Sequence, residues 1–313
     1  MYFQKEVGEL GATFSQLAIL FIFILCGFAV GKIKKIPREK SSVISALLVN
    51  VFLPAKIFLN FSEQCTLDYF SESYPTLIVS TALLLLLVLF SLGLSRLLTK
   101  ERYERKVYRY SFAISNYAYL GYVFVENTLG KTALTDMILF CIPFAFYTYT
   151  FGYTLLSNQS GSWKKLINPM TVVIVFGMIF GISGLQLPDF LGKTLSYASA
   201  TVGPLSMILT GLVISSFALK ELLPDIKTVI FSVVRLAVIP ALLLGICLAA
   251  DKLFTLPSAV YPTAVIMGCM PCGLNTIVFP SLVGEDCRIG ARFVLLTHVL
   301  SLATIPLWMW ILV

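Results

Sequence analysis

The stretch that decides the fold reads Gly268-Cys269-Met270-Pro271-Cys272-Gly273-Leu274-Asn275-Thr276-Ile277-Val278-Phe279-Pro280. It lies in an apolar segment, residues 259–283, that can cross a bilayer, because about 20 helical residues span the ~30 Å hydrocarbon core. Pro271 has no N–H to donate, and its ring opposes the carbonyl four residues earlier. A backbone break in hydrocarbon persists only inside protein or beside a water-filled cavity. The sequence therefore predicts a functional site at this interruption.

The composition is that of an integral membrane protein. Of the 313 residues 58% are hydrophobic and 12% are charged, and the mean hydropathy is +0.89, which argues against a soluble enzyme. The apolar runs are continuous rather than alternating, so they favour helices over a β-barrel. Lys5, Glu6 and Glu9 precede the first run, whereas the cluster of Lys and Arg residues follows it, and no small-residue cleavage site appears. We therefore do not interpret this run as a signal peptide.

A hydropathy window of about 19 residues divides the chain into ten expected spans joined by short loops. We therefore predict one all-α polytopic membrane domain over residues 1–313. The spans are expected near residues 13–31, 41–61, 75–95, 107–128, 136–156, 169–186, 198–219, 228–250, 259–283 and 291–313.

The net charge of +7 follows the expected loops. Alternate connections hold seventeen Lys and Arg residues, and the connections on the other side hold four. Basic loops face the cytoplasm, so both termini are expected on the extracytoplasmic side of the cell membrane. The positive net charge is therefore explained by the orientation of the chain in the lipid bilayer, and we expect no nucleic-acid partner.

A weak internal repeat links the two halves of the chain. Val51–Asn60 in the second span aligns with Thr201–Thr210 in the seventh, and Asn116 lies at a similar offset from Asn275. Each half holds five spans, an odd number, so the halves must be inverted relative to each other, as in many secondary transporters. We expect the first repeat over about residues 13–156 and the second over about 169–313.

On these residues the chain resembles the auxin efflux carrier family of membrane transporters, particularly its short bacterial members. The resemblance runs over nearly the whole chain and is carried by the order and spacing of Pro54, Asn116 with Gly121, Asn168-Pro169, Leu187-Pro188, Pro204 with Gly211, Arg235 with Pro240, and Pro271 with Asn275. It implies two inverted five-helix repeats, like those of bile-acid symporters. Spans one, two, six and seven would form a scaffold, and the rest would form a transport domain in which broken spans four and nine cross.

The resemblance also implies a site for an organic anion at that crossing. The substrate-binding residues would be Asn116, Asn275, Tyr117, Gly121 and Pro271. Where the family usually has Pro after the fourth-span Gly, this chain has Val123, so the fourth-span break would rest on Gly121 alone. The short loop at 157–168 lacks the long insert of many plant members, which weakens auxin as the substrate.

Physical chemistry independently favours an anion at two meeting half-helices. Each helix start presents unpaired N–H groups and roughly +0.5 charge, and the amides of Asn116 and Asn275 add neutral donors. The alternative is that these amides only join helices, at about 0.6–2 kcal/mol.

Lys56, Arg235 and His298 are ionisable residues inside the expected spans that need a separate interpretation. Lys56 either snorkels outward or lines an electropositive vestibule that draws anions inward. Arg235 is expected to anchor at the cytoplasmic interface. His298 is expected to be a packing residue held by hydrogen bonds, with proton relay as the alternative.

Cys269 and Cys272 form a C-x-x-C pair without a second pair or a nearby His. A redox or metal site would need a stabilised thiolate or further ligands. We interpret the pair as small residues that let the crossing helices approach, and we expect no cofactor and no metal.

The leading hypothesis is a secondary carrier for a small organic anion such as a mono- or dicarboxylate, working by alternating access. No paired carboxylates lie at either break, which disfavours sodium or proton exchange. The alternatives are a sodium-coupled symporter of the bile-acid type, a non-transporting receptor and a membrane-embedded enzyme. The enzyme is disfavoured because no catalytic motif or acid–base team is evident. A homodimer remains open.

Overall fold

The computed structural model describes residues 2–34, 38–157, 169–281 and 283–312, and every regular element within them is helical. The helices of twelve or more residues are α1 (Tyr2–Lys34), α3 (Leu53–Gln64), α5 (Pro75–Leu98), α6 (Arg102–Ala113), α8 (Lys131–Tyr147), α10 (Pro169–Ile182), α11 (Asp189–Ser215), α13 (Ile239–Asp251) and α16 (Arg288–Leu312). The shorter helices are α2 (Arg38–Leu47), α4 (Leu67–Ser73), α7 (Tyr122–Leu129), α9 (Tyr153–Ser157), α12 (Ile226–Val233), α14 (Val260–Cys269) and α15 (Asn275–Ser281). Four π-helical turns and one 3-10 turn complete the set: η1 (Leu48–Phe52), η2 (Tyr117–Gly121), η3 (Thr148–Gly152), η6 (Val234–Val238) and η5 (Leu219–Leu222). Asn168 and most of the short loop expected at 157–168 fall outside the described residues.

Within the described residues, seven helical stretches are long and apolar enough to cross a membrane. They are Gly11–Ile33, Ser41–Gln64, Leu67–Leu98, Lys131–Ser157, Asp189–Ser215, Ile226–Asp251 and Arg288–Leu312. The all-α polytopic membrane character predicted from the sequence is thus confirmed. The other three expected spans coincide with α6–α7, α10 and α14–α15, each of which is short or interrupted.

The fifth and seventh spans begin earlier than expected, for reasons that lie in local backbone conformation. The fifth span begins at Lys131 rather than 136, because Gly130 adopts a φ of 90° that ends α7 and lets α8 start at once. The seventh begins at Asp189 rather than 198, directly after the extended residue Pro188. The apolar window misplaced this start because the first turns of α11 are polar.

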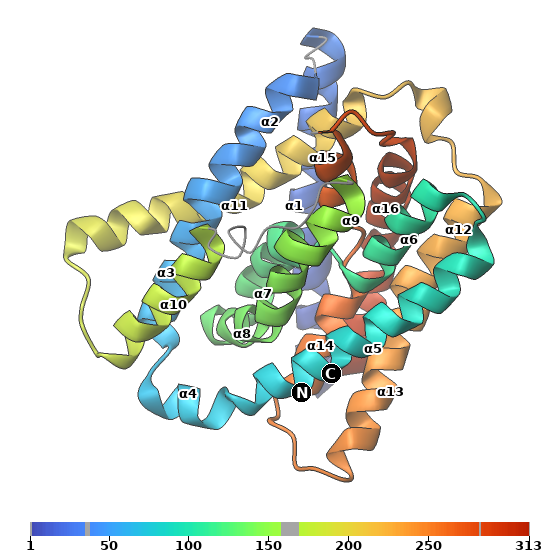
Figure 1. Cartoon of the computed structure of the whole chain (residues 1–313). Coiled ribbons are helices and arrows are strands. Elements are labelled where there is room, and N and C mark those ends of the chain that lie inside the picture. The colour runs from blue at the N-terminus through green and yellow to red at the C-terminus, as the bar shows by residue number, and fades with distance from the viewer. Residues whose placement is uncertain (1, 35–37, 158–168, 282, 313) are drawn as a thin grey trace.

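One group of helices packs through glycines. A Cβ on Gly27 would collide with a backbone carbonyl of α11, and a Cβ on Gly211 would collide with a carbonyl of α1. Gly181 of α10 lies in the same way against the carbonyl of Phe61 in α3 and that of Cys65 just after it. Small residues are what lets membrane helices approach this closely, so α1, α3, α10 and α11 form one close-packed unit (Figure 1).

The second group holds the interrupted helices. Helix α5 packs against α6 and α8, and α13 packs against α14 where Gly268 meets Pro240 and Leu243. Aromatic rings fill the space between α6, α12 and α16, with the rings of Phe231 and Phe293 stacked 3.8 Å apart between centroids. The interruptions in α6–α7 and α14–α15 therefore lie inside protein rather than against lipid.

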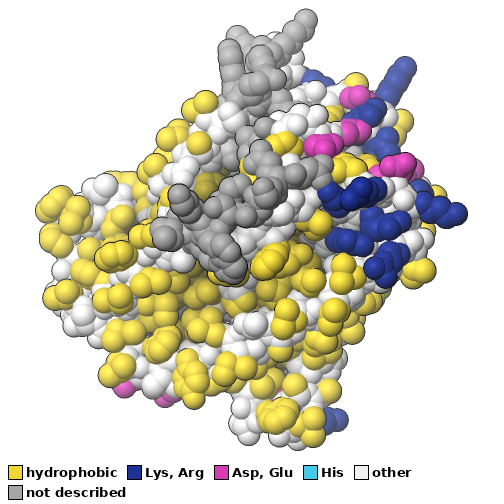
Figure 2. All heavy atoms as spheres, in the orientation of Figure 1, with side chains coloured by type: hydrophobic (Ala, Val, Ile, Leu, Met, Phe, Trp, Pro, Cys, Tyr) yellow, Lys and Arg dark blue, Asp and Glu magenta, His cyan; other side chains and the backbone are white. Residues whose placement is uncertain are grey.

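Charge and hydrophobic surface are segregated. Figure 2 shows hydrophobic side chains over most of the visible face, whereas Lys and Arg gather near the end of α5 and the start of α6. The marked chain ends lie away from this basic region, toward the lower part of Figure 1. This is the segregation that a membrane-spanning protein requires.

Candidate functional site

The first interruption lies between α6 and η2. Helix α6 ends at Ala113, the chain is extended at Ile114, and the π-helical turn η2 starts after Asn116 and runs directly into α7. None of the interrupting residues is Pro or Gly. The expectation that this break rests on Gly121 was therefore wrong, because Gly121 lies at the far end of η2 and serves to admit the side chains of Met137 and Met270.

The second interruption is explained by the residues at the break itself. Helix α14 ends at Cys269, and Met270 is extended, with ψ of 144°. This is the conformation that a residue before Pro favours. Helix α15 then begins at Asn275.

The two interruptions satisfy each other's backbone groups. The N–H of Asn116 donates to the carbonyl of Pro271 at 2.8 Å, and Ser115 pairs with Cys272 in an isolated antiparallel bridge. The Ser115 hydroxyl donates to the carbonyl of Met267 at 2.8 Å. A Cβ on Gly273 would lie 3.3 Å from the Ser115 carbonyl, so a glycine suits this close approach. The crossing is thus held by pairing between segments about 155 residues apart.

The side chain of Asn116 is buried inside the crossing and is held by a hydrogen bond. It is 2% exposed, and its Nδ2 lies 3.1 Å from Nε2 of His298. Nδ1 of that ring lies 2.7 Å from the carbonyl oxygen of Val294, which can only accept. In the neutral ring Nδ1 therefore carries the proton, and Nε2 accepts from the Asn116 amide. His298 is a hydrogen-bonded packing residue, as expected, and it holds one of the two crossing asparagines.

Asn275 lies in a more open environment. Its side chain is half-buried, and Nδ2 donates to the Tyr110 hydroxyl at 3.2 Å. Tyr117 is buried, and its ring meets Tyr122 edge-on with centroids 5.8 Å apart. Among the polar crossing residues, Asn275 is the one that keeps accessible surface.

Of the pockets along α11, two also reach a half-helix of the crossing, one on each half of α11. The first, of about 540 Å³, lies between α1, α3, α7 and α11 and includes Ser196, Ser199 and Pro204. The second, of about 470 Å³, lies between α2, α11 and α15 and includes Leu209 and Val213. Each pocket thus has the close-packed unit on one side and the half-helix after one break on the other.

The family model described as "Membrane transport protein" matches residues 12–165 and 154–309. The chain belongs to the auxin efflux carrier family. It is 24% identical over 308 residues to an uncharacterized transporter of Methanocaldococcus jannaschii, covering 94% of this chain and 97% of that protein. This family member is therefore a multi-pass membrane transporter.

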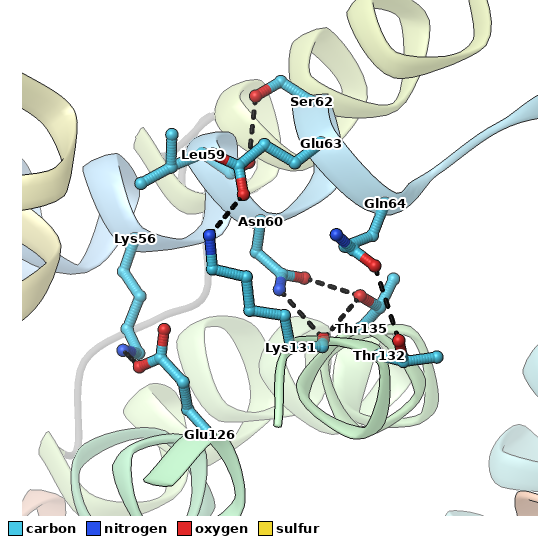
Figure 3. Close-up of polar contacts among 10 residues, drawn as sticks. All are labelled: Lys56, Leu59, Asn60, Ser62, Glu63, Gln64, Glu126, Lys131, Thr132 and Thr135. Atoms are coloured by element: carbon cyan, nitrogen blue, oxygen red, sulfur yellow. Dashed lines mark hydrogen bonds and ion pairs between the residues drawn. The ribbon is translucent and has the colours of Figure 1, made fainter. Parts of the chain in front are cut away.

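Lys56 of the carrier does not snorkel. Its side chain is 2% exposed and forms an ion pair with Glu126 of α7, which is 27% exposed and lines the first pocket (Figure 3). The pair links α3 to α7. Sequence reasoning treated the two residues separately because they are 70 positions apart.

A polar network extends this contact toward α8. Asn60 of α3 donates to the carbonyl of Lys131 at 3.1 Å and accepts from the Thr135 hydroxyl at 2.9 Å, while Lys131 pairs with Glu63 at 2.6 Å (Figure 3). Polar contacts at one end of the carrier thus join the close-packed unit, through α3, to α7 and α8 of the second group of helices.

Arg235 was misplaced by sequence reasoning. Its side chain is 0% exposed, and Nη1 donates to the carbonyl of Phe112 at 3.1 Å, one residue before the end of α6. An Arg a turn or two inside a span usually reaches the interface, but this one lies in the π-helical turn η6 and points into the carrier. The signal available from sequence was that an ionisable residue in a membrane segment is by default a functional candidate.

Cys269 and Cys272 are free, buried thiols. Cys269 Sγ lies 3.3 Å from the carbonyl of Ile266, and the N–H of Cys272 donates to the Thr297 hydroxyl at 3.0 Å. Across the residues that the structure describes, no three His, Cys, Asp or Glu side chains cluster as metal ligands would.

Proposed function

We propose that the carrier is a secondary transporter for a small organic anion, with a carboxylate as the recognised group. The substrate would bind at the crossing and move by alternating access. The observation that carries the proposal is the pair of half-helices that restart next to each other, at Tyr117 and Asn275, in the middle of a membrane protein.

The chemistry of the crossing suits an anion that must be released again. Residues 114–116 and 270–275 contain no charged side chain. Their donors are amide and backbone N–H groups, which hold a carboxylate by hydrogen bonds and helix dipoles rather than by a full ion pair. A Lys or Arg in place of these neutral donors at the starts of the half-helices would bind the anion more tightly and slow its release.

Asn275 is the residue proposed to contact the substrate. It starts α15 and remains half-buried, and its amide already donates to the Tyr110 hydroxyl. Asn116, with its amide held by His298, would contribute through the backbone of the turn that it starts. Tyr117, Gly121 and Pro271 would shape the site around these groups.

Alternating access is supported by the two pockets along α11. Each one separates the close-packed unit from a half-helix of the crossing, so sliding one unit against the other would open one pocket and close the other. We propose that the two units are the scaffold and the transport domain, and that the halves of the chain are inverted repeats. The cell membrane, with both termini outside, is the proposed location.

The experiment is flux into liposomes. Purified carrier would be reconstituted and offered labelled mono- and dicarboxylates, with a labelled amine and a neutral sugar as controls, under imposed pH and sodium gradients. Saturable uptake of at least one carboxylate and of neither control supports the proposal. Uptake of none, or equal uptake of the neutral sugar, would refute an anion carrier.

A further inference from the structure

The buried guanidinium of Arg235 is not explained by its hydrogen bonding. One nitrogen, Nη1, donates to the carbonyl of Phe112, while Nε and Nη2 have no hydrogen-bond partner among the residues that the structure describes. None of the ion pairs found among the described residues includes Arg235. A residue kept only to donate one hydrogen bond could be neutral. The positive charge, which is costly to bury, needs its own counterpart.

That counterpart is present in the backbone of the broken helices. A helix carries roughly −0.5 charge at its C-terminal end, where the last four carbonyls lack intrahelical partners. Helix α6 ends at Ala113 and α14 ends at Cys269, both inside the protein and both at the crossing. The two ends together supply a negative charge of about one unit.

Arg235 lies where it can act on both ends. It binds the Phe112 carbonyl in the last turn of α6, and its turn, η6, packs against α14. Gly268, in the last turn of α14, lies against Pro240 of α13, the helix that directly follows η6. A single fixed cation therefore binds the last turn of α6, and the turn that carries it packs against α14.

We propose that Arg235 is the resident counter-ion of the crossing, a positioning residue that neutralises the C-terminal ends of α6 and α14 and so keeps both helices broken. In transporters with discontinuous helices, such ends commonly coordinate a coupling cation. Here a side chain occupies that electrostatic role. The role in transport rests on the proposed function, but the role in holding the crossing does not.

The first test needs no substrate. The thermal midpoint of the purified carrier would be measured for wild type, Arg235→Lys, Arg235→Gln and Arg235→Ala. Lys should retain more stability than Gln, because charge and not hydrogen bonding is what the helix ends require. About 10 mM guanidinium chloride should raise the midpoint of Arg235→Ala, and the same concentration of urea should not. Arg109→Ala is the matched control, since Arg109 also donates to a neighbouring helix, through Ser95, but is partly exposed.

Equal midpoints for Lys and Gln, or equal effects of guanidinium on the Ala variants of Arg235 and Arg109, would overturn the proposal. The wild-type arm remains informative even if every Arg235 variant misfolds. When sodium is replaced by potassium or N-methylglucamine, the wild-type thermal midpoint should not shift, and carboxylate uptake, where it occurs, should change by less than about twofold. A specific stabilisation by sodium would show that the C-terminal ends of α6 and α14 bind a free cation. That result would refute the counter-ion role of Arg235 and leave the anion-carrier proposal unaffected.

Discussion

The ion pair between Lys56 and Glu126 should respond unequally to the loss of each partner. Lys56 is 2% exposed and Glu126 is 27% exposed and reaches the first pocket. Glu126→Gln leaves a buried ammonium without a partner, a change that costs about 3–5 kcal/mol when the charge is fully buried. Lys56→Met leaves a carboxylate that water in the pocket can solvate, so we expect a smaller cost of about 1–2 kcal/mol.

The double variant separates the pair from its parts. Lys56→Met with Glu126→Gln removes both charges and should recover most of the loss, to within about 1 kcal/mol of wild type, because a neutral pair of similar volume is often as stable as a buried ion pair. The coupling energy from the double-mutant cycle, which is the sum of the two single costs less the cost of the double variant, should therefore be about 3–7 kcal/mol.

The assay is unfolding of the purified carrier in detergent, with all four proteins measured at the same pH and salt. Lys131→Met is the control, because Lys131 and Glu63 are 53% and 38% exposed, and a pair of this kind contributes less than about 1 kcal/mol. Additive effects of the two single substitutions, or a Lys56→Met cost above that of Glu126→Gln, would refute the reasoning from burial.

Three other substitutions test the crossing, the close-packed unit and a helix cap. Tyr110→Phe removes the hydroxyl that holds the Asn275 amide and should raise KM about threefold to tenfold, with kcat changed less, in the flux assay; an unchanged KM would contradict the contact. Gly211→Leu places a side chain against the backbone of α1 and should abolish folding, judged by size-exclusion chromatography. Gly93→Leu is the control and should fold, because a Cβ added at Gly93 meets no atom within 4 Å. Asp225 caps α12, where partial burial is outweighed by hydrogen bonds from Thr228 and by nearby basic charge, so that its pKa lies below the usual value. Asp225→Ala should lower stability by about 1 kcal/mol at neutral pH. Because a depressed pKa stabilises the folded state only while the carboxylate is ionised, the difference should shrink as the pH falls below about 4, and a pH-independent difference would contradict this.

The sequence predicts the second interruption better than the first. Pro271 and Gly273 are residues that disfavour a helix wherever they stand, so that break can be read locally. The break at Ile114 contains no such residue. It exists because the extended chain at Ser115 and Asn116 pairs with Pro271 and Cys272, and pairing between distant segments leaves no local signal.

Charges inside the membrane were the hardest part to place. Hydropathy located Lys56 and Arg235 within spans but gave no information on which way either pointed. Lys56 is held by Glu126 of another helix, and Arg235 by a carbonyl in the last turn of α6. Both contacts depend on how the helices pack.

The central claim, that a half-helix starting at Asn275 binds a carboxylate, is tested most directly by initial uptake rates. Asn275→Ala would be compared with Asn50→Ala in liposomes loaded with equal amounts of folded protein. Asn50 is exposed and bonds only within its own helix, to Ala46, so it controls for removal of an amide.

Losing a hydrogen bond to a charged group costs about 1.5–3 kcal/mol, so Asn275→Ala should reduce kcat/KM by about 10-fold to 100-fold, and Asn50→Ala should leave it unchanged. Full-rate uptake by a folded Asn275→Ala carrier would contradict the proposed site.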